Sequence, residues 1–172
     1  SDVGDLSQGR YVVAGQSSTV SGYSSGGLAP PGPTTVNTID KFPFASNANA
    51  TDVGDLTVAR RASASQSSSI SGYNSGSYPI TNIIDKFPFA TNANATDVGD
   101  LTVDRFGSAG QSSIISGYTS GGMPPSFTST NVIDKFPFAS NANATDVGDL
   151  TVDRYYLAGQ SSTVSGYTSG GF

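Results

Sequence analysis

Residues 134–154 read DKFPFASNANATDVGDLTVDR, and two further stretches, starting at Asp40 and Asp85, repeat this sequence almost letter for letter. The motif DVGDL within it begins at Asp2, Asp52, Asp97 and Asp146, in steps of 50, 45 and 49 residues. Such a period is typical of solenoids and propellers, in which neighbouring units bury one another's apolar faces. We therefore predict one repeat array over residues 1–172, divided into a partial unit (1–9), full units (10–59, 60–104 and 105–153) and a partial unit (154–172).

Composition and turn spacing indicate that each unit is built of strands. All 13 acidic residues are aspartates and 21 of the 172 residues are glycine, so strong helix formers are scarce. Turn residues interrupt the sequence about every ten positions, which predicts four strands per unit. In the last full unit we place them near 106–115, 118–123, 131–138 and 145–152. We predict an all-β chain of four-stranded antiparallel sheets, each one a propeller blade, with an open β-repeat solenoid or filament as the alternative.

The unit resembles the kelch repeat. Val98, Leu101 and Arg105 stand where that repeat has two apolar residues and an arginine. The second strand with its double glycine is matched by YSSGG at Tyr23 and by YTSGG at Tyr118 and Tyr167. The resemblance implies a kelch-like β-propeller with blades of four antiparallel strands. The sequence is also similar to repeat runs in structural proteins of marine phages and bacteria, which implies an extracellular or virion-surface setting such as a tail fibre.

Two departures from the kelch pattern concern the core. The second unit lacks the double glycine, and the large aromatic residue of that repeat is replaced by Ala50, Ala95 and Ala144. We expect the phenylalanines of the third strand to compensate, since alternate residues of a strand share a face. These pairs begin at Phe42, Phe87 and Phe136, and they fill either the gap between two sheets or the core within one.

Charge and missing residue types disfavour several functions. The net charge is −5 and Lys and Arg do not cluster, so we expect no nucleic-acid partner. No apolar run is long enough to cross a bilayer, so we expect no membrane insertion. His and Cys are absent, which removes the usual general base and the thiol nucleophile. Since the serines recur at equivalent places in every unit, we predict that the chain is not an enzyme and has no cofactor.

An arginine follows the fourth strand of each unit, at Arg10, Arg60, Arg105 and Arg154. The aspartates nearby are spaced DxxDxxxD, as at Asp97, Asp100 and Asp104, without the glycine and glutamate of an EF-hand loop. Calcium binding is one interpretation. The interpretation that we favour pairs these acids with the arginines through charge-assisted hydrogen bonds between units. We therefore predict that the arginines are structural and that there is no metal site.

The tripeptide NAT occurs once in each full unit, with its asparagine at Asn49, Asn94 and Asn143. In a eukaryotic secretory setting this tripeptide is a glycosylation site. In a bacterial or phage protein it is a turn that favours asparagine. The sequence leaves both interpretations open.

The units differ most in the linker between the second and third strands. The linker reads LAPPGPTTV at 28–36, YPIT at 78–81 and MPPSFTST at 123–130. Loops on a rigid scaffold commonly carry recognition, and a neutral spacer is the alternative. As binding residues we predict Pro30, Pro31, Tyr78, Met123 and Phe127. A second variable place follows each arginine, and we attribute its variation to strand packing: Tyr11, Arg61, Phe106 and Tyr155.

These observations favour a structural or adhesive binding module of a virion or cell surface that recognises a protein or glycan through the variable loops. One alternative is an extracellular filament subunit, whose repeats stack from chain to chain. Another is an enzyme domain on a propeller scaffold, which the lack of histidine disfavours. The sequence starts and stops inside a unit, so we expect self-association or a longer chain, because unpaired strand edges invite aggregation.

Overall fold

The computed structural model of this chain describes residues 2–172, and all regular elements in that range are β-strands, with no helix. The prediction of an all-β chain is confirmed. Accordingly, residues 2–172 offer no helix that would cross a membrane. The strands are β1 (Ala14–Ser17), β2 (Ser21–Ser25), β3 (Leu28–Ala29), β4 (Thr34–Thr35), β5 (Thr38–Pro43), β6 (Thr51–Asp55), β7 (Ala64–Ser67), β8 (Ser71–Ser77), β9 (Thr81–Pro88), β10 (Thr96–Asp100), β11 (Ala109–Ser112), β12 (Ser116–Ser120), β13 (Val132–Pro137), β14 (Thr145–Asp149), β15 (Ala158–Ser161) and β16 (Gly166–Ser169).

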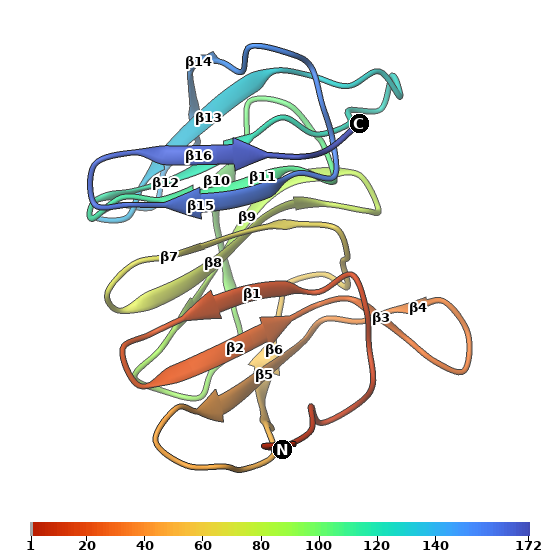
Figure 1. Cartoon of the computed structure of the whole chain (residues 1–172), viewed down its shortest axis with the longest axis vertical. Helices are drawn as coiled ribbons and strands as arrows, with labels where there is room; N and C mark the ends of the chain where they lie inside the picture. Colours follow the sequence, from red (N-terminus) through yellow and green to blue (C-terminus); the bar gives the residue numbers. More distant parts are fainter. Residues whose placement is uncertain (1) are drawn as a thin grey trace.

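Three four-stranded antiparallel sheets follow one another along the chain (Figure 1). Their strand orders are β1-β2-β5-β6, β7-β8-β9-β10 and β11-β12-β13-β14. Two smaller sheets have two strands each: β15-β16 repeats the first two strands of a unit, and β3-β4 is a hairpin inserted in the first unit. Each full unit therefore contains one four-stranded sheet.

The strands of the third unit are shorter than predicted, because turns begin earlier. The first of them, β11, spans Ala109–Ser112 where we expected 106–115. Phe106 lies outside it and forms only an isolated bridge with Met123. At the other end, the Oγ of Ser113 accepts hydrogen bonds from the backbone N–H groups of Ile115 (3.3 Å) and Ser116 (3.0 Å), which closes the turn to β12.

The motif DVGD forms each fourth strand and carries a β-bulge. In β10 the register shifts between Asp97 and Gly99, and the N–H of Gly99 donates to Oδ1 of Asp97 (3.1 Å). The φ of Gly99 is 150°, and a methyl group on this residue would lie 2.5 Å from the carbonyl oxygen of Ala142 in the next unit. Glycine is required here because two units approach through their backbones.

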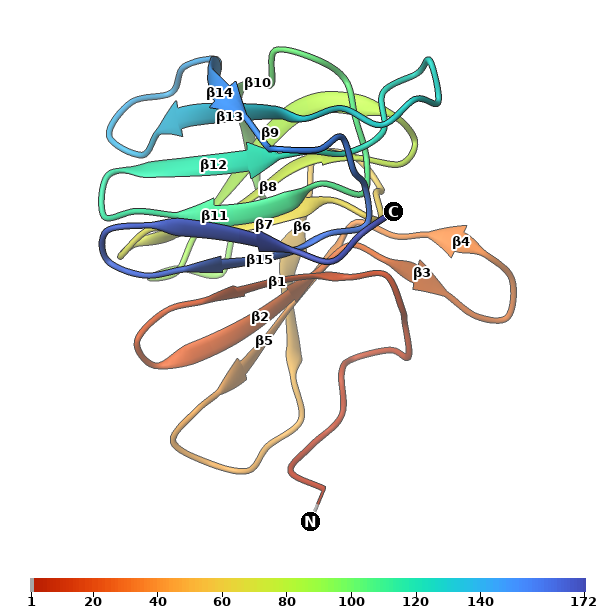
Figure 2. The ribbon, with the colours of Figure 1, turned by 45° about the horizontal axis from the view of Figure 1, so that its top comes forward.

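Successive sheets contact one another through their first strands, which lie side by side (Figure 2). In the three four-stranded sheets, the glutamine of the first strand donates from Nε2 to a carbonyl of the second strand in the next sheet. These bonds join Gln16 to Tyr73 (2.9 Å), Gln66 to Tyr118 (2.8 Å) and Gln111 to Tyr167 (3.3 Å). These hydrogen bonds run in the same direction at all three junctions, so the same contact recurs along the whole array.

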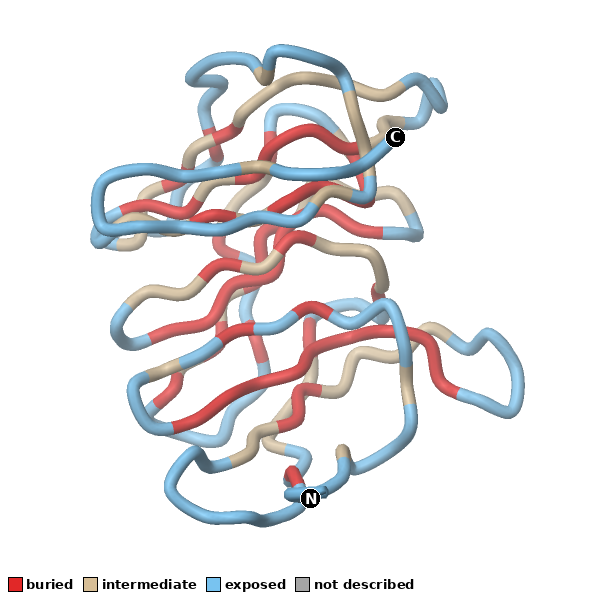
Figure 3. The backbone as a smooth tube through the Cα atoms, viewed as in Figure 1, coloured by how far each residue is buried: buried red, intermediate tan, exposed pale blue. Residues whose placement is uncertain are grey.

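Aromatic residues form the core between neighbouring sheets. Tyr23 of β2 stacks on Phe89 of the second sheet, with 4.8 Å between ring centroids. Tyr73 of β8 stacks on Phe138 beyond β13 in the same way, at 4.7 Å. Buried residues accordingly line the interior of the stack (Figure 3). The phenylalanine pairs of the second and third sheets therefore pack in the gap between sheets, and Ala95 is buried beside one of them. The pair of the first sheet, which begins at Phe42, belongs to neither of these cores, and Phe44 is exposed.

Candidate binding surface

The three variable linkers project from the same side of the array, at the right in Figure 1. In the first unit the linker is the β3-β4 hairpin, whose tip holds Pro30 and Pro31. In the second unit it is a short turn between β8 and β9, and in the third an irregular loop between β12 and β13. We call this side, formed by residues 28–36, 78–80 and 123–130, the loop edge.

The second variable place of each unit also lies at the loop edge. Reciprocal backbone hydrogen bonds join the residue after each arginine to a residue that follows the second strand. The joined pairs are Tyr11–Leu28, Arg61–Tyr78, Phe106–Met123 and Tyr155–Phe172. These residues lie outside the four-stranded sheets and extend the pairing of first and second strands through isolated antiparallel bridges, so the attribution of their variation to strand packing stays a prediction. The two variable places of a unit face each other and form one surface.

Aromatic side chains cross the loop edge from one unit to the next. The guanidinium of Arg61 lies over the ring of Tyr78, 4.3 Å from its centroid. Tyr78 meets Phe106 edge-on at 5.5 Å, and Phe106 meets Tyr156 at 6.0 Å. Tyr155 continues the row, at 5.1 Å from Tyr156 and 5.8 Å from Phe172. We call this row the aromatic strip: Arg61, Tyr78, Phe106, Tyr155, Tyr156 and Phe172.

Much of the aromatic strip is open to solvent. Tyr78 is 37% exposed, Tyr156 51% and Phe172 80%, whereas Phe106 is buried beneath them. Contiguous exposed apolar surface is uncommon on soluble proteins and marks places where other molecules bind. Tyrosine and phenylalanine are also enriched in the cores of protein interfaces. The strip can therefore provide the contact area of a binding site.

The backbone beneath the strip is fixed by a ladder of hydrogen bonds between units. One residue of each unit has a positive φ there, between 52° and 65°: Val12, Ala62, Gly107 and Tyr156. From Ala62 onward, the N–H of each donates to the carbonyl of the equivalent residue one unit earlier, at 3.2, 2.7 and 2.6 Å along the series. A positive φ is costly for residues other than glycine, above all for a β-branched one such as Val12. Strained backbone of this kind clusters at functional sites.

The structure brings two of the five predicted binding residues to the aromatic strip. Tyr78 belongs to the strip, and Met123 is half-buried in the bridge with Phe106. The other three are exposed at the ends of their loops and, in the described part of the chain, make no ring contact with the strip: Pro30, Pro31 and Phe127.

The other half of the candidate surface was missed from the sequence. Tyr155, Tyr156 and Phe172 all lie in the last partial unit, far along the chain from the linkers. The one indication in the sequence was that the residue after each arginine varies between units, and we attributed that variation to strand packing. Only the backbone pairing of this place with the linker shows that both belong to one surface.

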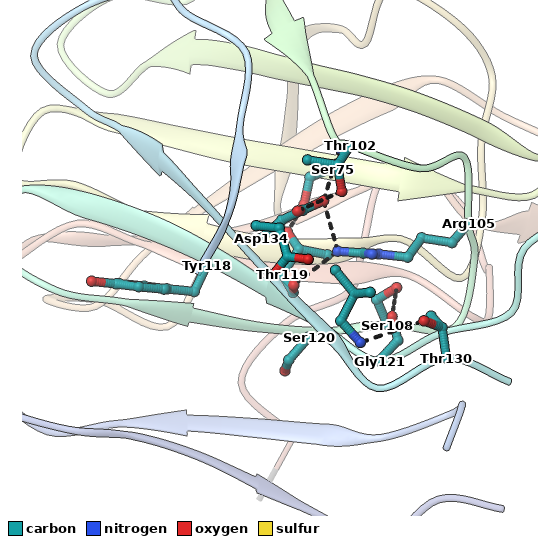
Figure 4. A network of polar contacts seen from close by, with 12 residues as sticks. Ser75, Thr102, Arg105, Ser108, Tyr118, Thr119, Ser120, Gly121, Thr130 and Asp134 are labelled. Atoms are coloured by element: carbon teal, nitrogen blue, oxygen red, sulfur yellow. Dashed lines mark hydrogen bonds and ion pairs between the residues drawn. The ribbon is translucent and has the colours of Figure 1, made fainter. Parts of the chain in front are cut away.

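The predicted structural arginines hold a buried aspartate of the third strand. In the third unit, Nη2 of Arg105 lies 2.9 Å from Oδ2 of Asp134 and donates to the carbonyl of Thr119 at 3.0 Å (Figure 4). Thr102 donates to the same carboxylate from its N–H (2.9 Å) and its hydroxyl (2.7 Å). We call each such pair of a hydroxyl residue and an arginine a carboxylate cradle. Two equivalent cradles occur earlier in the chain: Ser7 and Arg10 bind Asp40, and Thr57 and Arg60 bind Asp85.

Two of these cradles join neighbouring sheets. Thr102 and Arg105 follow β10 of the second sheet, whereas Asp134 lies in β13 of the third. The expected contact of the arginine with a carboxylate of the neighbouring sheet is thus present. Burial lowers the pKa of Arg105, and the negative charge of Asp134 opposes that shift. The cradle is a buried structural joint and offers no access to a substrate.

The acidic partners of the arginines differ from those predicted. We expected the DxxDxxxD acids, such as Asp97, but the ion pairs are formed with Asp40, Asp85 and Asp134 of the third strands. The reason is local, because Oδ1 of Asp97 accepts a hydrogen bond from the bulge glycine instead. Among residues 2–172, no three His, Cys, Asp or Glu side chains are grouped as metal ligands.

The asparagines of the NAT tripeptides connect units at the outer side of the sheets. Their Oδ1 atoms accept the backbone N–H of the second aspartate in the preceding DVGD motif, at 3.0, 3.0 and 3.1 Å. The pairs are Asn49 with Asp5, Asn94 with Asp55 and Asn143 with Asp100. This contact explains the repeated asparagine as a structural turn residue. An N-glycan is attached through Nδ2, so glycosylation stays a prediction.

Comparisons with known proteins give this chain no assignment. No protein-family model matches it, and no curated protein matches it. Its function is therefore inferred from the geometry of the loop edge.

Proposed function

We propose that the chain is a structural or adhesive binding module of a virion or cell surface, and that it recognises a protein or glycan through the loop edge. The observation that carries this proposal is the aromatic strip, whose exposed rings stand on backbone fixed from unit to unit. Rigid aromatic side chains provide contact area at low entropic cost. The linkers beside the strip add exposed apolar residues that differ between units, so one scaffold presents several different contacts.

A binding assay with a matched pair of variants tests this proposal. The first variant combines Tyr78→Ser, Tyr156→Ser and Phe172→Ser in the aromatic strip. The control combines Val20→Ser, Ile70→Ser and Val164→Ser, which are 67%, 68% and 90% exposed in the turns between first and second strands. Both remove exposed apolar surface from places outside the buried cores.

We expect the unmodified chain to bind members of an array of cell-surface glycans or purified surface proteins. The strip variant should lose at least about tenfold in affinity, since aromatic anchors carry most binding energy at such surfaces. The control variant should keep the affinity of the unmodified chain. Equal losses in the two variants, or no bound member of the array at all, would contradict the proposal.

We also propose that the sheets are blades of a kelch-like β-propeller. In support, β1, β7, β11 and β15 lie side by side, as the innermost strands of blades do around a common axis. An extracellular filament is the second candidate, favoured by the outer edge of β16, which pairs with no strand in residues 2–172. Electron microscopy separates the two, because rings with a central channel support the propeller and extended rods support the filament.

A further inference from the structure

Each filled core between two sheets consists of the same two halves. The earlier sheet contributes a tyrosine, an isoleucine and a leucine, and the later sheet contributes two phenylalanines from the motif IDKFPF. The first core joins Tyr23, Ile39 and Leu56 to Phe87 and Phe89; the second joins Tyr73, Ile84 and Leu101 to Phe136 and Phe138. Where only one half is present, we therefore expect the other half to be its binding partner.

The third sheet presents the first half of such a core without the second. Its tyrosine, isoleucine and leucine are Tyr118, Ile133 and Leu150, and they line a hollow of about 390 Å³ together with residues of β16. Tyr118 is half-buried, whereas the equivalent tyrosines of the first two units are 4% and 2% exposed. The hollow thus lies where two phenyl rings lie in the filled cores.

The carboxylate cradle of the fourth unit lacks its aspartate. Thr151 and Arg154 are equivalent to Thr102 and Arg105, yet the ion pairs within residues 2–172 do not include Arg154. Its Nη1 donates to the carbonyl of Gly170 at 3.2 Å, and Thr151 is exposed. A second hollow, of about 160 Å³, is lined by Thr151, Arg154, Leu150 and Thr168.

The edge of β16 has the register that these two hollows require. In the third sheet, Gly117 of β12 pairs with Phe136 and Thr119 pairs with Asp134. The equivalent residues of β16 are Gly166, which lines the larger hollow, and Thr168, which lines both. A strand in this register therefore places its phenylalanine and its aspartate at the two hollows.

In each full sheet, the glycine of the second strand leaves room for the phenyl ring of the residue with which it pairs. A methyl group on Gly117 would collide with the ring of Phe136, and the same holds for the glycines of the other two full sheets. At Gly166 the only heavy atoms near such a methyl group belong to the flexible side chain of Gln111. Both strands of the β15-β16 sheet are largely exposed (Figure 3).

We propose that the outer edge of β16 is a docking site for an antiparallel strand with the repeat's own sequence, Ile-Asp-Lys-Phe-Pro-Phe, carried by another repeat unit. The aspartate of that strand binds Thr151 and Arg154, and its phenylalanines pack against Tyr118 and Leu150. Main-chain hydrogen bonds to β16 provide affinity, and the two side-chain sites provide specificity. The site uses no residue of the aromatic strip, so it goes beyond the function proposed above.

A synthetic peptide tests the site in the full chain. The peptide TNVIDKFPFAS copies residues 130–140 and is titrated into the chain by fluorescence anisotropy. We expect saturable binding. A peptide with asparagine in place of the aspartate should bind at least about tenfold more weakly, because it loses charge-assisted hydrogen bonds. A peptide with serine in place of both phenylalanines should show no saturable binding.

Variants of the chain locate the bound peptide. Arg154→Ala should reduce the affinity for the aspartate peptide to that for the asparagine peptide, and it should leave the latter unchanged. Gly166→Val should abolish binding by blocking the ring site. Arg61→Ala, in the aromatic strip, should leave the affinity unchanged. Circular dichroism checks that each variant keeps its strands.

Three results would overturn the proposal. They are the absence of saturable binding, equal affinities for the aspartate and asparagine peptides, and equal affinities of the unmodified chain and Arg154→Ala. Sedimentation velocity shows whether the chain dimerises, as it would if a second copy of the chain occupied the outer edge of β16. Dimers that the aspartate peptide dissociates support the site, whereas dimers that exclude the peptide contradict it. A failure of the loop-edge assay changes none of these results.

Discussion

Loss of the ion pair between Arg105 and Asp134 should reduce stability strongly. Both residues are fully buried, and their nearest nitrogen and oxygen atoms are 2.9 Å apart. In the variant Arg105→Ala, the buried carboxylate keeps only the two hydrogen bonds from Thr102. Removing one partner of a buried pair costs about 3–5 kcal/mol. We expect the free energy of unfolding, measured by urea denaturation, to fall by that amount.

The chain supplies its own control for this experiment. Arg154 stands at the same place of the repeat without an ion-pair partner in the described residues, so Arg154→Ala should cost less than about 1 kcal/mol. Arg61→Ala removes a half-exposed contact with Tyr78 and a hydrogen bond to Thr35, for about 1 kcal/mol. Equal losses for Arg105→Ala and Arg154→Ala would refute the reasoning, since the carboxylate would then contribute nothing.

Three further outcomes are expected. Gly99→Ala should lower the melting temperature more than Gly148→Ala, because φ is alike at both (150° and 151°) but only Gly99 faces a carbonyl of the next unit; equal shifts would contradict this. Phe136→Ala should cost about 3–5 kcal/mol in urea denaturation, and the equivalent Phe42→Ala, at a half-exposed ring, about 1–2 kcal/mol. Burial raises the pKa of Tyr23, so its contribution to stability is complete below about pH 10 and is lost as pH rises through the raised pKa. Ultraviolet titration should show Tyr23→Phe removing a late-ionising tyrosine, and removal of an early one would argue against burial.

The repeat and its strands were predictable because turn residues interrupt the sequence at a regular spacing. The pattern also placed Phe136 and Phe138 on one face of a strand, since alternate residues share a face. It did not say which sheet they meet, because alternation fixes the face of a strand and not its partner. That partner is Tyr73, 63 residues earlier than Phe136, and only the stacking of sheets brings the two together.

The partner of Arg105 was harder to predict for a similar reason. The chain has 13 aspartates, and those nearest in sequence seemed the best candidates. Asp97 accepts a hydrogen bond from the bulge glycine of its own strand. Arg105 instead pairs with Asp134, 29 residues away. The aromatic strip was missed because its members come from several units and contact one another only once those units are stacked.

The hydrogen bond from a first-strand glutamine to the carbonyl of a second-strand tyrosine has the same partners and the same direction at each of the three junctions between sheets. This uniformity bears on how the chain changes over generations. An in-frame duplication of one unit creates a junction whose two faces already match, without compensating mutations. The unequal steps of 50, 45 and 49 residues arise from the linkers, which take no part in these glutamine hydrogen bonds. Insertions at the loop edge therefore alter the exposed surface while the scaffold keeps its contacts. Gene copying and loop variation can proceed independently in such a protein, and a surface that meets changing partners gains new shapes without a new fold.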